Sequence, residues 1–291
     1  MIGTGHCLGV RLGRMAVSLL VLAFAAGNAL CQMDSAEEEP HPLLPSSSWK
    51  IAFEYDSVDY EEGGWFSLFT DDPSIDGSLY GVDLAWTGHQ PDGLMLQLGT
   101  GFVGGGLEYD GGTHSGTPVK EDTDDFIWRL RGLIGYDFEW ANFALTPYTG
   151  IGYRYWNNDV GGPGGYEREI QYLYTPIGVE TVAPIGDKWK WGLRGEYDLF
   201  WAGTVKSHLS DVLDGLNDLT NDQDDGYGVR GAVYFERRFE NVSLGLELFI
   251  RYWNIDRSDR DTLTFHGIPV GEGVEPKNDT VVSGFQVALV F

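Results

Sequence analysis

The feature that most constrains this chain is the alternation of apolar and polar residues at every second position. In "WKWGLRGEYDLFW" (189–201), one face carries Trp189, Trp191, Leu193, Tyr197, Leu199 and Trp201, and the other carries Lys190, Arg194, Glu196 and Asp198. Successive side chains of a β-strand point to opposite faces, so a period of two indicates a half-buried strand. One such strand fits a soluble sandwich as well as a membrane barrel.

The pattern recurs in ten segments, joined by alternately short and long connections. Short connections such as "HQPDG", "EWAN", "PIGD" and "FENV" alternate with long ones at 59–77, 105–125, 157–169, 204–226 and 255–279. Outer-membrane barrels sort their connections in this way, into short periplasmic turns and long external loops. The sequence therefore predicts an all-β fold, a transmembrane antiparallel up-and-down β-barrel of about ten strands (8–12), with five long external loops. The expected strands are 49–58, 78–88, 94–104, 126–138, 143–156, 170–183, 188–203, 227–238, 242–254 and 280–291. The fifth loop has room for an additional hairpin beyond the membrane.

The region before the barrel has the composition of an export signal. Arg11 and Arg14 precede the apolar run "MAVSLLVLAFAAG", which is too short for a membrane anchor, and small residues follow it. We expect residues 1–31 to be a signal peptide, 32–48 a flexible acidic periplasmic lead-in and 49–291 the transmembrane barrel. Both cysteines, Cys7 and Cys31, lie in the signal segment, so no disulfide is expected in the mature chain.

The polar faces of the expected strands hold as many acids as bases. Such a balance favours a narrow, salt-bridged lumen, because each buried charge needs a partner. The expected lumen ion-pair network comprises Glu54, Asp56, Asp83, Arg129, Arg131, Arg154, Glu180, Arg194, Glu196, Asp198, Arg230, Glu247 and Arg251, accompanied by Lys50, Lys190 and Glu236. Inward-pointing glycines at 99, 101, 150 and 152 would leave space for the alternative of a narrow channel.

The formal charge of −25 is concentrated in the long connections, which hold 27 acids and 6 bases. Nucleic acid requires a basic surface, so it is not an expected partner. Aromatic residues near the strand ends are expected in interfacial girdles. They are Trp49, Trp86, Trp128, Trp189, Trp201, Tyr153, Tyr155 and Trp253.

The phrases "LTPYTGIGYRYW" (145–156) and "YLYTPIGVE" (172–180), together with Phe291, resemble small Gram-negative outer-membrane barrels of the opacity type. This resemblance implies location in the cell outer membrane and contact with lipopolysaccharide. It also implies delivery to the barrel-assembly machinery, with Phe291 as the membrane-assembly signal.

The ten-strand topology is also similar to that of the omptin surface proteases, which use paired acids and an Asp-x-His dyad. No Asp-x-His occurs here. The nearest candidates are Asp71 and Asp72, with His114, His208 or His266, and His208 together with Asp211. If the protein is an omptin-like protease, its catalytic residues therefore stay unassigned.

Other chemistry is sparse. Helical spacing of leucines predicts a short helix within 207–219, and "NDQDDG" (221–226) resembles the start of an EF-hand loop but has Ala232 where the final glutamate should stand. No cofactor and no His/Cys metal site is expected. The favoured function is a monomeric surface barrel with a structural or interaction role, including an adhesin-like one, for an unknown extracellular ligand. The alternatives are a narrow channel for small solutes or ions and an omptin-like protease.

Overall fold

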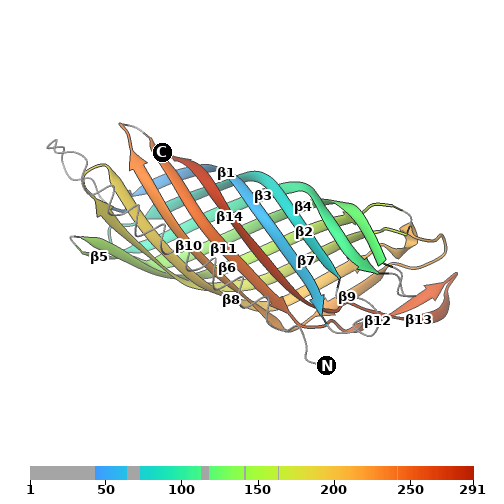
Figure 1. The fold of residues 1–291 in the computed structure, drawn as a ribbon. Helices are drawn as coiled ribbons and strands as arrows, with labels where there is room; N and C mark the ends of the chain where they lie inside the picture. Colours follow the sequence, from blue (N-terminus) through green and yellow to red (C-terminus); the bar gives the residue numbers. More distant parts are fainter. Residues whose placement is uncertain (1–42, 64–72, 113–117, 141, 163, 241) are drawn as a thin grey trace, which may run out of the picture.

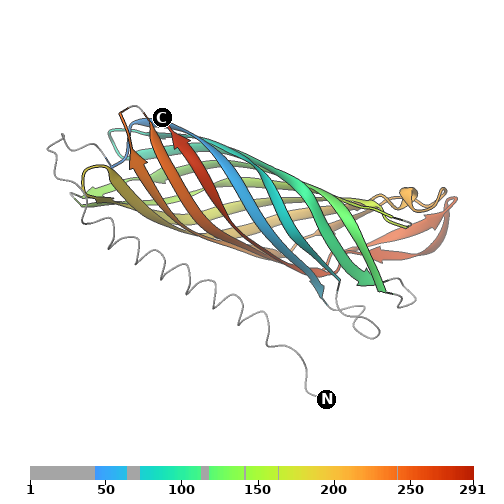
Figure 2. The ribbon, with the colours of Figure 1, turned by 45° about the horizontal axis from the view of Figure 1, so that its top comes forward.

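The computed structural model describes residues 43–63, 73–112, 118–140, 142–162, 164–240 and 242–291. Its main element is a closed antiparallel barrel of ten strands, seen from the side in Figures 1 and 2. Each barrel strand pairs with the next along the chain, and the last returns to the first. The barrel strands are β1 (Ser47–Gly63), β2 (Ser74–His89), β3 (Leu94–Gly112), β4 (Pro118–Tyr136), β6 (Phe143–Val160), β7 (Glu167–Ile185), β8 (Trp189–Ser207), β10 (Gly226–Arg238), β11 (Ser243–Ile255) and β14 (Lys277–Val290).

The barrel closes where β14 pairs with β1, in a register that runs from Lys50↔Val290 to Gly63↔Lys277. At the periplasmic end of this seam, Trp49 and Phe291 exchange both backbone hydrogen bonds, at 2.7 and 3.0 Å. Neither β1 nor β14 is left as an open edge, so all ten strands satisfy their backbone groups within the barrel.

Five smaller elements are attached to the barrel ends. β5 (Phe138–Trp140) extends the wall beside β6 at the end that carries the C-terminus. At the opposite end are the 3-10 helix η1 (Leu209–Asp211), β9 (Leu219–Gln223), which pairs with β8, and the hairpin of β12 (Arg260–Phe265) and β13 (Ile268–Val274). No helix among the described residues is long and apolar enough to cross a membrane.

The outer wall is apolar only along the periplasmic half of each strand. On β1, Trp49, Ile51 and Phe53 point outward and are about half exposed, whereas Asp59 and Glu61 occupy the same outward row nearer the other end. The 17 residues of β1, at about 3.3 Å each and a tilt near 45°, rise roughly 40 Å, against about 25 Å for a lipid-facing band. The barrel therefore crosses the membrane with its periplasmic half and extends well beyond it on the extracellular side.

These observations confirm the fold class and the ten strands, and they correct several details. The strands of the first half are longer than expected, with 16 to 19 residues in β1 to β4 rather than 10 to 13, because the inward apolar row continues above the lipid band. The hairpin allowed for in the fifth loop is present as β12 and β13. The signal peptide at 1–31 and most of the lead-in at 32–48 lie outside the described residues.

The helix expected within 207–219 is wrong. Only η1 forms there, and Leu219 is the first residue of β9, paired with Ser207 of β8. Gly215 adopts a φ of 99°, a left-handed conformation that interrupts a helix. "NDQDDG" does not form an EF-hand loop either, because its first half is part of β9.

Candidate functional site

The lumen of the barrel contains a belt of buried ion pairs at mid-height. Two Glu-x-Asp sequences, one on β1 and one on β8, place both of their carboxylates inward, because residues i and i+2 of a strand share a face. On the β1 side, Arg129 Nη2 lies 2.8 Å from Glu54 Oε1 and Arg129 Nη1 lies 3.3 Å from Asp56 Oδ2. Arg251 Nη1 contacts the same Glu54 oxygen at 2.7 Å. We call these residues and their β8 counterparts the ion-pair belt.

The β8 half of the ion-pair belt repeats this arrangement. Arg230 Nε lies 2.6 Å from Asp198 Oδ2 and 3.1 Å from Glu196 Oε1. Arg131 also pairs with Glu196. Removing any one of these charges would leave its partner charged, buried and unpaired, which is strongly unfavourable. The belt therefore holds the lumen side chains in one arrangement.

Arg154 lies in the ion-pair belt without a carboxylate partner among the described residues. It is the direct cross-strand neighbour of Arg129, and its side chain is buried. Its guanidinium carbon lies 4.9 Å from the centre of the Trp156 ring and 5.3 Å from that of Tyr172. Both Nη atoms lack a hydrogen-bond partner in the described structure, so aromatic faces supply the stabilisation that an acid would otherwise give.

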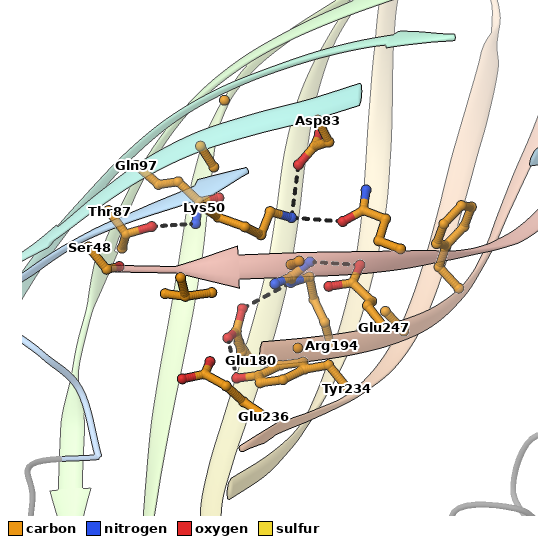
Figure 3. A pocket seen from close by; sticks show the side chains of 18 of the residues that line it. Ser48, Lys50, Asp83, Thr87, Gln97, Glu180, Arg194, Tyr234, Glu236 and Glu247 are labelled. Atoms are coloured by element: carbon orange, nitrogen blue, oxygen red, sulfur yellow. Dashed lines mark hydrogen bonds and ion pairs between the residues drawn. The ribbon is translucent and has the colours of Figure 1, made fainter. Parts of the chain in front are cut away.

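On the periplasmic side of the ion-pair belt the lumen widens into a cavity of about 230 Å³, lined by both charged and apolar side chains, which we call the vestibule. Figure 3 shows Lys50 directed at Asp83, with Nζ and Oδ1 2.8 Å apart, and Arg194 held between Glu180 (2.9 Å) and Glu247 (3.5 Å). Lys190 pairs with Glu236 in the same space, and Leu43, Leu44 and Pro45 line its wall. All thirteen residues of the expected lumen network therefore face the interior, in the ion-pair belt or the vestibule.

On the extracellular side of the ion-pair belt, buried apolar and aromatic side chains fill the lumen. Tyr60 meets Trp156 edge to face at 5.4 Å between ring centres, and Tyr174 meets Trp253 in the same way at 5.0 Å. Nine of the ten barrel strands contribute buried residues to this apolar plug, and β10 adds the partly buried Ala232. Its residues are Val58, Tyr60, Ile75, Leu79, Val103, Leu107, Ile127, Trp156, Ile170, Tyr172, Tyr174, Phe200, Val205, Phe249, Trp253, Ile255 and Val282, with Ala232 packed against them.

Two expectations about the lumen are wrong. Trp253 is not in an interfacial girdle but only 2% exposed within the apolar plug. Gly152 does not open a passage, because the Tyr174 ring covers it: a Cβ at Gly152 would lie 2.1 Å from that ring. Tyr148 covers Gly178 and Tyr234 covers Gly192 in the same manner. Inward glycines here accommodate aromatic rings from neighbouring strands.

Above the apolar plug, one arginine is shared between two acids. Arg168 Nη1 lies 2.7 Å from Glu62 Oε1 and 3.5 Å from Glu275 Oε1, and the Tyr60 hydroxyl donates to Glu62 at 2.9 Å. Burial raises the pKa of Glu275, in the connection before β14, to about 7, although Arg168 acts in the opposite direction. A single guanidinium thus serves two carboxyl groups, one of which retains its proton near neutral pH.

The fourth and fifth connections pack together into an extracellular protrusion, which contains β9, β12 and β13 at the right-hand end of Figure 1. Asn221 of β9 donates to the carbonyls of Asp259 (2.9 Å) and Gly273 (3.2 Å), and the His266 amide donates to the Gly215 carbonyl at 2.7 Å. The protrusion exposes apolar side chains and has an acidic surround. Its exposed apolar residues are Val212, Leu213, Ile268 and Val270.

The omptin-like candidates do not assemble in the described residues. Asp71, Asp72 and His114 lie outside them. His208 is half-buried and pairs with Glu169 and Asp218 rather than with Asp211. His266 lies at the tip of the β12–β13 hairpin, where it has a φ of 48° and its ring contacts Phe265 at a tilt of 57°.

No protein-family model and no curated protein matches this chain. Among solved structures, it is similar to the outer membrane protease OmpT from Escherichia coli, with 12% identity, a TM-score of 0.54, and 90% of this chain and 100% of that chain covered. It is also similar to OprG from Pseudomonas aeruginosa (12% identity, TM-score 0.38, 88% and 99% covered) and to Ail of Yersinia pestis (9%, 0.33, 84% and 99%).

At such identities the likeness to OmpT shows a shared barrel fold and not a shared activity. Together with the apolar outer band, it confirms the expected class of Gram-negative outer-membrane β-barrel and the expected location in the outer membrane. Barrels of one shape serve different tasks, so the specific role of this chain depends on its own loops and lumen.

Proposed function

We propose that this barrel is a surface interaction protein whose extracellular protrusion binds a partner outside the cell. The observation that supports this most strongly is the division of the molecule into a filled barrel and an exposed tip. The buried residues of the apolar plug come from nine of the ten barrel strands, whereas Ile268 is 68% exposed and Val270 57% exposed on the hairpin. A chain that fills its lumen and leaves apolar residues at its outermost point is suited to contact rather than to transport.

The chemistry of the protrusion defines the partner. Exposed apolar residues gathered at one place favour protein contact. The β12–β13 hairpin forms a two-stranded sheet separate from the barrel wall, and it carries acids such as Asp261 and Glu272. The partner we propose is therefore a protein with an apolar centre and a basic rim, consistent with the net charge of −25. Lipopolysaccharide around the barrel wall, and the assembly machinery at Phe291, are further proposed partners.

Attachment assays test this proposal. Cells that display the barrel are scored for binding to a cultured cell layer, and Ile268→Ser with Val270→Ser is compared with Ile268→Val and Val270→Ile. We expect the serine pair to lose most of the attachment and the apolar pair to retain it. Equal attachment by both pairs, at equal surface display, would rule out the hairpin as the contact site.

A narrow channel is the second candidate, and the vestibule is the observation that favours it. The vestibule already provides about 230 Å³ of space on the periplasmic side, so conduction would require the ion-pair belt and the apolar plug to move. Recordings of the refolded barrel in planar bilayers, with peptide hydrolysis assayed on the same preparation, separate the three roles. Discrete ion steps would favour the channel, and turnover of a peptide would favour the protease.

A further inference from the structure

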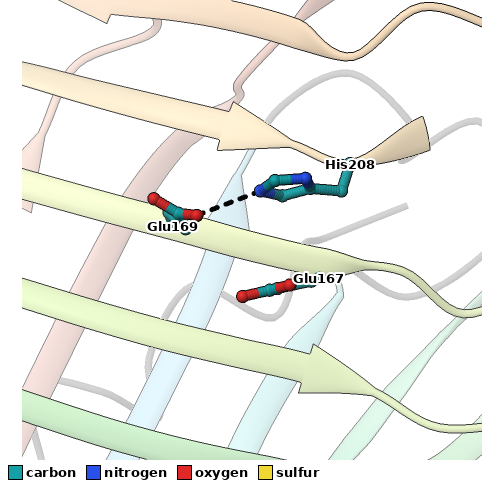
Figure 4. Close-up of side chains that lie close together, drawn as sticks. All are labelled: Glu167, Glu169 and His208. Carbon is teal, nitrogen blue, oxygen red and sulfur yellow. Dashed lines mark hydrogen bonds and ion pairs between the residues drawn. The ribbon is translucent and has the colours of Figure 1, made fainter. Parts of the chain in front are cut away.

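Three potential metal ligands converge on the outer wall of the barrel above the lipid band. Glu167 and Glu169 occupy the outward row of β7, and the same row reaches the exposed, lipid-facing Leu173 four residues further on. His208 follows β8 directly, and its backbone amide donates to the Glu167 carbonyl at 2.9 Å. Figure 4 shows the three side chains on adjacent strand ends, with the imidazole directed at Glu169.

The donor atoms of this cluster are spaced almost closely enough to coordinate one divalent cation. One donor atom from each of Glu167, Glu169 and His208 lies within 4.8 Å of the others. Ligands at about 2.1 Å from a zinc ion lie roughly 3 to 4 Å from one another, so small side-chain rotations would complete the coordination. All three side chains are half-buried, and both strand ends are held in the sheet, which limits the cost of ordering them.

Neighbouring groups orient the donors. Asn157 donates a hydrogen bond to Glu167. His208 Nδ1 lies 3.4 Å from Asp218 Oδ2, and its Nε2 lies 3.1 Å from Glu169 Oε1. A carboxylate on one imidazole nitrogen is the arrangement that directs the other nitrogen to a metal. Three carboxylates surround the histidine against one ammonium, that of Lys206, which lies 3.8 Å from Asp218, so a divalent cation would offset the excess negative charge.

We propose that Glu167, Glu169 and His208 form a binding site for a divalent transition-metal ion of the zinc class. The imidazole nitrogen discriminates against Mg²⁺ and Ca²⁺, which prefer all-oxygen sites. Three protein ligands leave one coordination position open to solvent. The ion would tie the start of the fourth connection to the wall of β7, beside the protrusion. The competing interpretation is an ion-pair clasp between His208 and Glu169, in which Glu167 has no part.

Glu167 therefore distinguishes the two interpretations. The full barrel, refolded in detergent micelles, is titrated calorimetrically with ZnCl₂ and with MgCl₂. We expect one zinc ion per chain and no comparable magnesium binding. Glu167→Gln and His208→Gln should each weaken zinc binding by at least about tenfold. The matched controls, Glu272→Gln and His266→Gln on the hairpin, should bind zinc like the unaltered chain.

Absence of saturable one-to-one binding would overturn the proposal, and so would wild-type affinity in Glu167→Gln, which would leave only the clasp. X-ray absorption of the zinc-loaded unaltered barrel gives a readout that needs no variant. We expect a first shell of nitrogen and oxygen at about 2.0 to 2.1 Å that includes an imidazole. A shell without imidazole would also overturn the assignment. Because these measurements do not involve attachment, they test the zinc site independently of the proposed surface function.

Discussion

The shared arginine above the apolar plug predicts that the fifth connection is held more firmly at acidic than at alkaline pH. Glu275 is buried between Glu62, Arg168 and Tyr60, and its pKa in the folded chain is about 7 instead of the usual 4.5. The folded state therefore holds this proton over a pH range in which the unfolded segment has released it. Stability from this group is fully present below about pH 4.5 and is lost as the pH rises to about 7.

The magnitude follows from the gap between the two values. At 1.36 kcal/mol per pH unit, the difference between 4.5 and about 7 corresponds to roughly 3 kcal/mol between acidic and alkaline conditions. The change should be local, because Glu275 joins the two ends of the fifth connection through two hydrogen bonds with Ser258. Ser258 N donates to the Glu275 carbonyl at 3.1 Å, and Glu275 N donates to Ser258 Oγ at 2.8 Å.

Amide hydrogen exchange between pH 5 and 8 measures this effect directly. After correction for intrinsic exchange, the opening free energy at the Ser258 and Glu275 amides should fall by up to roughly 3 kcal/mol as the pH rises. Glu275→Gln, which is neutral at every pH, should abolish the change, and Glu272→Gln, at an exposed glutamate of the same connection, should preserve it. Protection that increases with pH, or a pH response that survives in Glu275→Gln, would refute the shared-arginine explanation.

Three further changes test the barrel interior. Arg129→Met leaves buried carboxylates of the ion-pair belt short of a partner and should lower the free energy of unfolding, measured in urea, by about 3 to 5 kcal/mol; an unchanged midpoint would contradict the belt's role. Trp253→Ala with Tyr172→Ala removes two large aromatic rings from the seventeen-residue apolar plug, and ion steps should appear in bilayers where the unaltered barrel is silent. Gly152→Ala would displace Tyr174 and should cost about 1 to 3 kcal/mol, whereas a neutral result would show that the ring has room to move.

The sequence could predict the barrel because alternation and loop sorting are local patterns that survive folding. The sequence also indicated which charges face the lumen. Alternate residues of a strand share a face, so one inward residue fixes the direction of the others. The error at Trp253 came from neglecting this alternation: Arg251 was assigned inward, and Trp253, two residues later on β11, must share its face. An aromatic residue near a strand end can lie in an interfacial girdle or in the lumen, and the residues two positions away, which share its face, decide between the two.

Other features depended on contacts distant in the chain. The leucines in 207–219 have helical spacing, but Leu216 bridges to Phe265 and Leu219 joins β9, so tertiary pairing overrides the local pattern. The cluster of Glu167, Glu169 and His208 was missed for a similar reason. Glu-x-Glu on one strand was readable, but the register of β7 against β8, which brings His208 beside it, was not.

The seam between β1 and β14 also has a kinetic consequence. Lys50 and Gln286, which hydrogen-bond across it, are 236 positions apart in the sequence, whereas the other strand pairs of the barrel mostly join near neighbours. Closing so long a loop is slow, because its entropy is lost before the final contacts compensate. Until that step, β1 and β14 present two unsatisfied edges, and the interior charges have only part of their partners. Folding of this chain should therefore be limited by ring closure, and a surface that holds either edge in the meantime would accelerate it.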